Sequence, residues 1–280
     1  MLTAAALRVL TEEDRADLLA LVARDPVANV FVAARLHAAM GQPWRTAGEL
    51  WGHQSGDVLD GACYSGANLV PVEASEVALR VFAERALRQG RRCSSIVGPR
   101  EMVRTLWNAL EAGWGPAREV RDDQPLLALA GAPDVAPDPH VRRVRMDELD
   151  LLLPACVAMF TEEVGVSPHG ADGGAIYRAR VAELIGSGRA FARFDGDQVV
   201  FKAEIGAVSP QVCQVQGVWV HPDLRGKGLS ASGMAAVTEA AQRDFAPTVS
   251  LYVNAWNLAA RRSYERVGFE QVGCFATVLF

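Results

Sequence analysis

The sequence predicts an α/β protein built from two domains. Half of its 280 residues are apolar, which is enough for packed cores. Some segments alternate apolar and polar residues, as β-strands do, and others repeat apolar residues with the period of a helix. The two kinds of segment follow one another along the chain. Residues 130–139 contain three prolines, and such a stiff, extended stretch is hard to place inside a packed unit. We therefore expect a first domain at residues 1–130, a Pro-rich linker at 131–139 and a second domain at 140–280.

The second domain has the more regular pattern. Asp195–Gly196–Asp197 is a strong hairpin signal, and Asn257 and Gly268 are the residue types of a helix N-cap and a left-handed C-cap. In chain order we expect a strand at Val141–Arg145, a helix at Glu148–Glu163, a loop at Gly165–Gly174, a helix at Ala175–Ile185, strands at Ala190–Phe194, Val199–Val208 and Val212–Val220, a helix at Leu229–Phe245, a strand at Val249–Val253, a helix from Asn257 to Gly268 and a closing strand at Val272–Phe280.

The first domain has a weaker pattern. Helices are expected at Glu12–Leu21, Ala28–Met40, Val77–Gln89 and Met102–Glu111, and strand-like segments at Gly61–Val70 and Leu126–Leu129. These segments again mix helices with strands, so the first domain is also expected to be of the α/β class.

Composition and charge argue against several classes of protein, namely nucleic-acid-binding, membrane-spanning, secreted and metal-binding proteins. The net charge is −5 and no long basic cluster occurs, so nucleic-acid binding is not expected. No apolar run is long enough to span a membrane, and Met1–Leu10 lacks the basic flank and long apolar stretch of a secretory signal. The five cysteines are an odd number, widely spread and without a C-x-x-C pair, which favours the reducing cytoplasm. The histidines are equally scattered, so no metal site is predicted.

A glycine-rich, basic turn, Pro222–Ser230, joins a predicted strand to a predicted helix. The N–H groups at a helix N-terminus favour an anion such as a phosphate or pyrophosphate, and Arg225 and Lys227 add full positive charge. Gly226 and Gly228 let the backbone approach a ligand closely. An ordinary strand-to-helix turn with solvated charges is the alternative.

A second run of functional character lies in the helix that begins near Asn257. Asn257, Ala260 and Tyr264 share one face of this helix, because their spacings are three and seven. The small side chain of Ala260 leaves room beside Tyr264 for a thin ligand.

Together these runs resemble the GNAT superfamily of acetyl-coenzyme A-dependent N-acetyltransferases. The family pattern is a strand ending in V-x-P, then R/Q-x-x-G-x-G/A, and later N-x-x-A-x-x-x-Y-x-x-x-G-F. The chain has Val220–Pro222, then Arg225 and Gly228, and later the full second pattern in Asn257–Phe269. Ser230 stands where the family usually has Gly or Ala, and serine is small enough for cofactor binding to survive.

The resemblance implies a mixed, mostly antiparallel sheet flanked by helices, with acetyl-coenzyme A as co-substrate. The order of elements in residues 1–130 is similar, so a tandem of a degenerate and an intact GNAT domain is expected. The nearest glycine turn of the first half is Gly98–Glu101, and Pro99 removes an amide from it. An unrelated α/β domain without a cofactor motif is the alternative.

The resemblance also implies the roles of individual residues. The strand 218–220 is expected to splay from the next strand, so that its free amides pair with the pantetheine arm. Tyr264 is expected to protonate the departing thiolate as the general acid, with core packing as the alternative. The expected cofactor-binding residues are Val218, Trp219, Val220, Arg225, Gly226, Lys227, Gly228, Leu229, Ser230, Asn257, Ala260 and Tyr264.

The general base is less evident. Many relatives use a glutamate on the V-x-P strand, but this strand offers Gln214 and Gln216, which do not accept a proton usefully. Glu204 on the neighbouring strand is our first candidate, acting directly or through water. Glu162 and Glu163 are alternatives that would instead hold a cationic substrate. For each carboxylate, a solvated or structurally paired side chain is the alternative.

We therefore expect an N-acetyltransferase that moves an acetyl group to a primary amine of a small molecule, protein or peptide in a ternary complex. A cytoplasmic monomer or homodimer is expected. A non-catalytic acyl-coenzyme A sensor is the alternative, because it would keep the phosphate turn and lose the base. A serine hydrolase is rejected, since Ser232 stands where the G-x-S-x-G elbow needs its second glycine.

Overall fold

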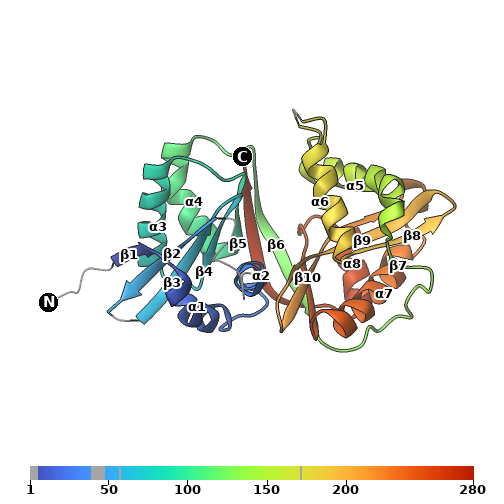
Figure 1. Ribbon diagram of the computed structural model, residues 1–280, viewed down its shortest axis with the longest axis horizontal. Helices are drawn as coiled ribbons and strands as arrows, with labels where there is room; N and C mark the ends of the chain where they lie inside the picture. Colours follow the sequence, from blue (N-terminus) through green and yellow to red (C-terminus); the bar gives the residue numbers. More distant parts are fainter. Residues whose placement is uncertain (1–5, 39–47, 57, 171) are drawn as a thin grey trace. The chain divides into compact units, whose positions relative to one another are not determined.

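The computed structural model describes residues 6–38, 48–56, 58–170 and 172–280 (Figure 1). The start of the segment Met1–Leu10, the end of the helix expected at Ala28–Met40, and Ala171 of the loop Gly165–Gly174 lie outside these residues. The chain forms two compact units. Unit 1 holds the described residues up to Leu127 together with 252–256 and 271–280, and unit 2 holds 128–251 and 257–270.

Unit 2 contains the elements that the sequence predicts for its part of the chain. Its strands follow the order β11-β10-β9-β8-β7, with β10 and β11 parallel and the other pairs antiparallel. The elements are β7 (Arg142–Arg143), η2 (Met146–Glu148), α5 (Leu149–Val164), α6 (Ala175–Gly186), β8 (Ala190–Asp195), β9 (Gln198–Val208), β10 (Val212–Val220), η3 (Pro222–Leu224), α7 (Leu229–Asp244), β11 (Thr248–Tyr252) and α8 (Leu258–Val267).

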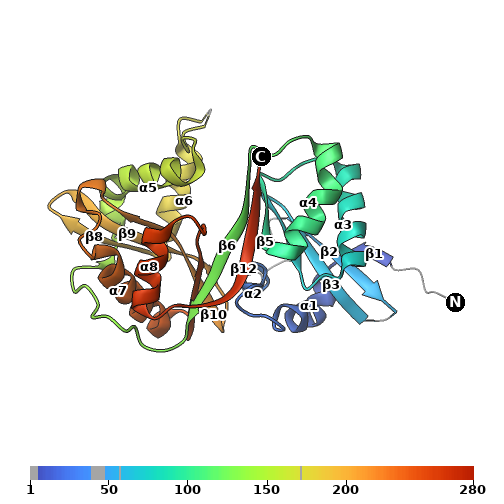
Figure 2. The same cartoon turned by 180° about the vertical axis from the view of Figure 1, so that it is seen from behind.

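Helices cover both faces of this sheet. Gly233 of α7 packs on Phe201 of β9 so closely that a β-carbon there would lie 2.7 Å from the ring. Cys156 of α5 contacts Glu204 of the same strand. Phe201 and Glu204 point to opposite faces because side chains alternate along a strand. Figure 2 shows α7 and α8 together on the face opposite to α5 and α6.

Unit 1 also combines parallel and antiparallel strands with helices. Its strand order is β1-β2-β3-β4-β5-β12-β6, in which β4 and β5 are parallel. The elements are β1 (Ala6–Val9), η1 (Glu12–Asp14), α1 (Arg15–Val22), α2 (Val30–Ala38), β2 (Glu49–Ser55), β3 (Val58–Ser65), β4 (Asn68–Val72), α3 (Glu76–Gln89), β5 (Ser95–Pro99), α4 (Arg100–Trp114), β6 (Glu119–Leu129) and β12 (Glu270–Leu279). The four helices predicted in residues 1–130 are present, whereas β1, β2 and β5 were not predicted.

The last strand of the chain corrects one expectation. Val272–Phe280 was expected to close the sheet of the second domain, but β12 pairs antiparallel with β5 inside unit 1. Its Ala276 and Val278 are 1% exposed in a core with Phe82 of α3. The burial of these apolar side chains holds the strand there. The units divide between Leu127 and Ala128, next to the expected linker, and two later segments, 252–256 and 271–280, belong to unit 1.

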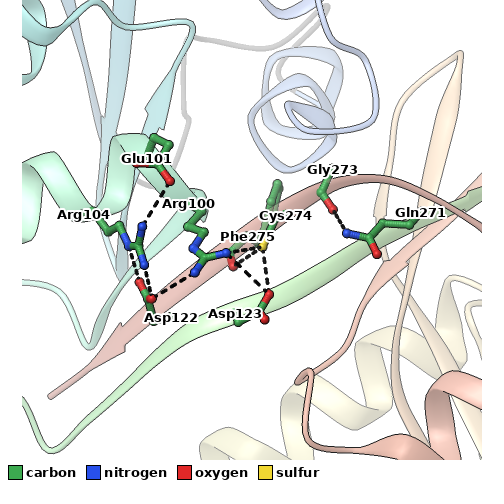
Figure 3. A network of polar contacts seen from close by, with 9 residues as sticks. All are labelled: Arg100, Glu101, Arg104, Asp122, Asp123, Gln271, Gly273, Cys274 and Phe275. Atoms are coloured by element: carbon green, nitrogen blue, oxygen red, sulfur yellow. Dashed lines mark hydrogen bonds and ion pairs between the residues drawn. The ribbon is translucent and has the colours of Figure 1, made fainter.

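A polar network ties β12 to its neighbours in unit 1 (Figure 3). The Sγ of Cys274 lies 3.2 Å from Asp123 Oδ1 of β6. Arg100, the first residue of α4, contacts Asp122 Oδ2 at 3.3 Å and Asp123 Oδ1 at 3.8 Å. Arg104 adds an ion pair with Asp122. These contacts join α4, β6 and β12 in unit 1.

Candidate acyl-transfer site

Strand β10 leaves its parallel neighbour after the first three of its nine residues. Its ladder with β11 covers Val212–Gln214 opposite Thr248–Ser250, while β10 itself continues to Val220. The end of β10, which holds the predicted cofactor residues 218–220, therefore lies beyond the shared ladder. This is the splayed geometry that the sequence resemblance implied.

A β-bulge lies at the same end of β10. Gln216 is opposite Glu204 and Trp219 is opposite Lys202, so two residues of β10 face a single residue of β9. Gly217 within the bulge has φ +61°. A β-carbon at Gly217 would lie 3.1 Å from Met159 Cε and 3.2 Å from Glu204 Oε2. The positive φ favours glycine here, and a β-carbon would require Met159 or Glu204 to shift by a few tenths of an ångström.

The predicted anion turn ends in free amides at the start of α7. After η3 the chain passes through Gly226 (φ +77°) and Gly228 (φ +84°) before α7 begins at Leu229. Gly228 is the N-cap, so α7 has no side-chain cap. Within the described chain, the amides of Leu229 and Ser230 have no hydrogen-bond acceptor. A β-carbon at either glycine would meet nothing within 4 Å. The turn is therefore an open set of donors at a positive helix end.

Arg225 departs from its expected role in this turn. Its Nη2 donates to Glu162 Oε2 at 2.7 Å, and its Nε donates to the carbonyl of Val220 at 3.1 Å. The other oxygen of Glu162 accepts from Trp219 Nε1 at 3.1 Å. Glu162 thus lies beside the predicted cofactor strand and turn, and it is already occupied by two donors. It is not a free carboxylate for a cationic substrate.

Helix α8 places Tyr264 as the sequence pattern predicts. Asn257 caps the helix by accepting from the Ala260 amide at 3.2 Å, and Gly268 ends it with φ +102°. Tyr264 is 6% exposed. Burial, with a smaller effect of Glu163, raises the pKa of the Tyr264 phenol above its usual value. The hydroxyl is therefore neutral, and able to donate a proton, across the neutral pH range.

The end of α5 connects these features. Met159 contacts the bulge at Gly217, Glu162 holds Trp219 and Arg225, and Glu163 acts electrostatically on Tyr264. One helix end therefore contacts the splayed strand and Arg225 of the turn, and it acts electrostatically on the predicted acid. Of the predicted cofactor residues, the structure places Trp219 and Arg225 in contact with α5.

Glu204, the candidate base, is part of a buried polar cluster. Its Oε1 accepts from Lys202 Nζ at 2.5 Å and from Cys156 Sγ at 3.7 Å. Lys202 is 0% exposed and Glu204 is 5% exposed. Burial disfavours the charge of Lys202, but Glu204 and Cys156 more than offset this, so the pKa of Lys202 is raised. Burial also raises the pKa of the Cys156 thiol to about 11.

The second oxygen of Glu204 faces another way. Oε2 lies on the side of the Gly217 bulge. The carboxylate is therefore held by an ammonium and a thiol on one oxygen, while the other faces the splayed end of β10. Sequence reasoning did not single out Lys202 or Gly217. Both residues could have been found from the sequence. Gly217 is a glycine within a strand, which indicates a bulge, and Lys202 is a charged residue in the apolar strand segment 199–205, where lysine is unusual.

Comparison with known proteins identifies this part of the chain. Residues 158–269 match the model described as "Acetyltransferase (GNAT) family", and residues 48–152 match a domain of unknown function, DUF4081. Residues 158–269 belong to the GNAT acetyltransferase family. The GNAT match includes the splayed strand, the turn and α8. A search of curated proteins found no match.

Solved structures share the GNAT fold across almost the whole chain. A Drosophila protein aligns with a TM-score of 0.65 and 15% identity over 99% of both chains. A GCN5-related N-acetyltransferase from Sphaerobacter thermophilus aligns with a TM-score of 0.61 and 15% identity, over 100% of this chain and 97% of that one. A tandem GNAT protein from the clavulanic acid biosynthesis pathway aligns with a TM-score of 0.56 and 16% identity over 98% of each chain. The predicted GNAT fold is confirmed.

Unit 1 differs from the GNAT domain at the corresponding strand-to-helix connection. Only residues 73–75 join β4 to α3, whereas residues 221–228 join β10 to α7. The α3 helix is capped by its own Ser75 Oγ, which accepts from the Ala78 amide at 3.2 Å. Glu73 has φ +49° and accepts from Asn29 at 2.9 Å. A carboxylate and a side-chain cap thus lie where the GNAT domain has open amides.

Metal-binding clusters and membrane-spanning helices are both absent from the described residues. No group of three or more His, Cys, Asp or Glu side chains is arranged to hold a metal ion there. Within the same residues, none of the helices combines the length and apolarity needed to cross a membrane.

Proposed function

We propose that the GNAT domain transfers an acetyl group from acetyl-coenzyme A to a primary amine of a small molecule, protein or peptide. The observation that carries this proposal is the combination of a bulged, splayed β10 with an open amide turn directly after it. The splay offers unpaired backbone to a pantetheine arm, and the turn offers donors to a pyrophosphate. Both lie in the segment that matches the acetyltransferase family model.

The cofactor would lie along three elements. The backbone of Val218–Val220 would pair with the pantetheine arm, and the turn 225–230 would hold the pyrophosphate. Asn257 and Ala260, on the first turn of α8, would border the arm, since Ala260 has only a methyl side chain. The GNAT family uses acetyl-coenzyme A as its co-substrate, and these residues fit that ligand.

The chemistry would follow direct transfer in a ternary complex. The amine nitrogen attacks the thioester carbonyl carbon, the C–S bond breaks, and the sulfur leaves with a proton. Tyr264 would supply that proton, because its hydroxyl is buried and stays neutral. Glu204 would take the proton from the amine, directly or through water, on Oε2, the oxygen that faces the bulge. Holding both reactants in one site would supply much of the acceleration.

The acceptor would approach along the α5 side of β10. We assign amine binding to Glu163 at the end of α5, because its charge acts on Tyr264, the proposed acid. The free state of all five cysteines favours a reducing compartment such as the cytoplasm. The proposed mechanism requires acetyl-coenzyme A and an amine as partners, and it does not require a metal.

The test combines binding with turnover. Acetyl-coenzyme A should bind by calorimetry, and thiol release should depend on a member of a primary-amine panel of amino acids, polyamines, aminoglycosides and lysine peptides. Binding without amine-dependent thiol release would contradict the enzymatic assignment.

A second candidate function has one observation in its favour. Glu204 has an oxygen occupied by Lys202 and Cys156, and β10 has glutamines where many relatives carry the base. A non-catalytic acyl-coenzyme A sensor would keep the turn and tolerate such a carboxylate. This candidate predicts tight binding of acetyl-coenzyme A and no acceleration with any amine.

A further inference from the structure

We propose that Arg225 serves the cofactor turn indirectly, by neutralising Glu162, and that Lys227 is the side-chain cation that meets the bound anion. The inference rests on the proposed cofactor function of the turn. It assigns different roles to two cations that the sequence pattern treats alike.

The first observation is the position of the Arg225 side chain. Its Nη2 and Nε are both engaged, by Glu162 at 2.7 Å and by the Val220 carbonyl at 3.1 Å. The guanidinium thus lies against α5 and the end of β10. It acts as a positioning residue, which fastens the start of the turn to the strand.

The second observation concerns Glu162. Its two oxygens accept from Trp219 and Arg225, and Trp219 is 8% exposed within the core of unit 2. The Trp219 bond therefore fixes this carboxylate beside the turn. Without Arg225, a negative charge would remain there. At ordinary salt, charges within ~10 Å still interact, so a bare Glu162 would repel a phosphate held by the turn.

The third observation is the freedom of Lys227. It lies between Gly226 and Gly228, both with positive φ, and its side chain is exposed. In the part of the chain that the structure describes, no carboxylate forms an ion pair with its ammonium. It is next to the unpaired amides at the start of α7. Lys227 is therefore the cation of the turn that remains available for an anion.

A double-mutant cycle with coenzyme A separates the two roles. Arg225→Met should weaken coenzyme A binding about tenfold in calorimetry, because Glu162 loses its counter-charge. Glu162→Gln with Arg225→Met should restore binding to within about threefold of wild type, since the repulsive charge is gone. Arg225→Lys should retain most of the affinity. Lys227→Met should weaken binding about tenfold and make it less dependent on salt.

A matched control comes from an exposed ion pair between α6 and α5. Arg178 contacts Asp150 of α5 at 2.5 Å, and Arg178→Met should leave coenzyme A affinity unchanged. Circular dichroism and thermal melting of each variant check that it is folded.

Each result has a clear reading. If the double variant binds as weakly as Arg225→Met, Arg225 contacts the anion itself and the proposal is wrong. If Lys227→Met binds like wild type, the role given to Lys227 is wrong. If wild-type protein does not bind coenzyme A at all, the proposed function fails, and that outcome differs from both of the others.

Discussion

Gly217 lies directly against the carboxylate of Glu204, so that a β-carbon at Gly217 would stand 3.2 Å from Glu204 Oε2. The bulge in β10 and the candidate base therefore occupy one small volume. Because Lys202 fixes the opposite oxygen of this carboxylate, neither the bulge nor the base is free to move alone. The shape of the proposed acyl site thus depends on this contact.

Replacing Gly217 with Ala should destabilise the protein by about 2–3 kcal/mol, because it adds both backbone strain and a clash. Gly196 is a matched control: it has φ +56°, and a β-carbon there meets nothing within 4 Å. Gly196→Ala should cost only the strain, about 1 kcal/mol. Chemical denaturation measures both. Equal losses in the two variants would show that the contact with Glu204 is unimportant.

Tyr264→Phe should lower turnover by a factor of about 10²–10⁴, the usual effect of a general acid, and leave acetyl-coenzyme A affinity nearly unchanged. The control is Tyr177→Phe, since the Tyr177 hydroxyl donates to the Cys156 carbonyl at 2.9 Å and has no assigned role in the chemistry. Stopped-flow thiol release with calorimetric affinities distinguishes them. Unchanged turnover in Tyr264→Phe would show that Tyr264 only packs in the core and does not act as the acid.

The raised pKa of Tyr264 also predicts a pH dependence. An unfolded tyrosine ionises near pH ~10, whereas the folded one stays neutral above that value. The stability that this neutral state contributes is complete below pH ~10 and is lost as the pH rises further. Wild type should therefore lose more stability than Tyr264→Phe between pH ~10 and ~11 in urea titrations. Parallel losses in both proteins would contradict the shift.

The position of β12 predicts where its substitutions act. Val278→Ala should cost about 2 kcal/mol, because Val278 is 1% exposed and pairs with Ile96 of β5. Val272 of the same strand is 54% exposed, and Val272→Ala should cost less than about 0.5 kcal/mol. Urea unfolding measures both. A small loss for Val278→Ala would argue against the burial of β12 in unit 1.

Local signals explain which parts of the fold were predictable. The cap at Asn257, the end at Gly268 and the hairpin at Gly196 depend on neighbouring residues, so α8 and the β8–β9 pair could be read from sequence. Strand β5 was missed because it is short and ends at Pro99. Alternation identified the last strand but not its partner, since pairing with β5 joins residues far apart in the chain.

The site shows the same division between local and distant effects. The turn and the Asn257–Tyr264 spacing are local patterns, so both could be identified from neighbouring residues in the sequence. The partners of Glu204 and Arg225 come from other elements, so the sequence did not reveal that Lys202 binds one and Glu162 binds the other. Glu162, which was expected as an alternative ligand for a cationic substrate, accepts hydrogen bonds from Trp219 and Arg225 in the structure.

Calorimetric titration of the full chain with acetyl-coenzyme A tests the central claim most directly. We expect one site per chain, because unit 1 has a capped helix and Glu73 where the GNAT domain has open amides. Gly228→Val should abolish that site in a folded protein, since Gly228 has φ +84° and a β-branched residue does not adopt this conformation. Two equivalent sites in wild type, no binding, or unchanged affinity in folded Gly228→Val would contradict the account.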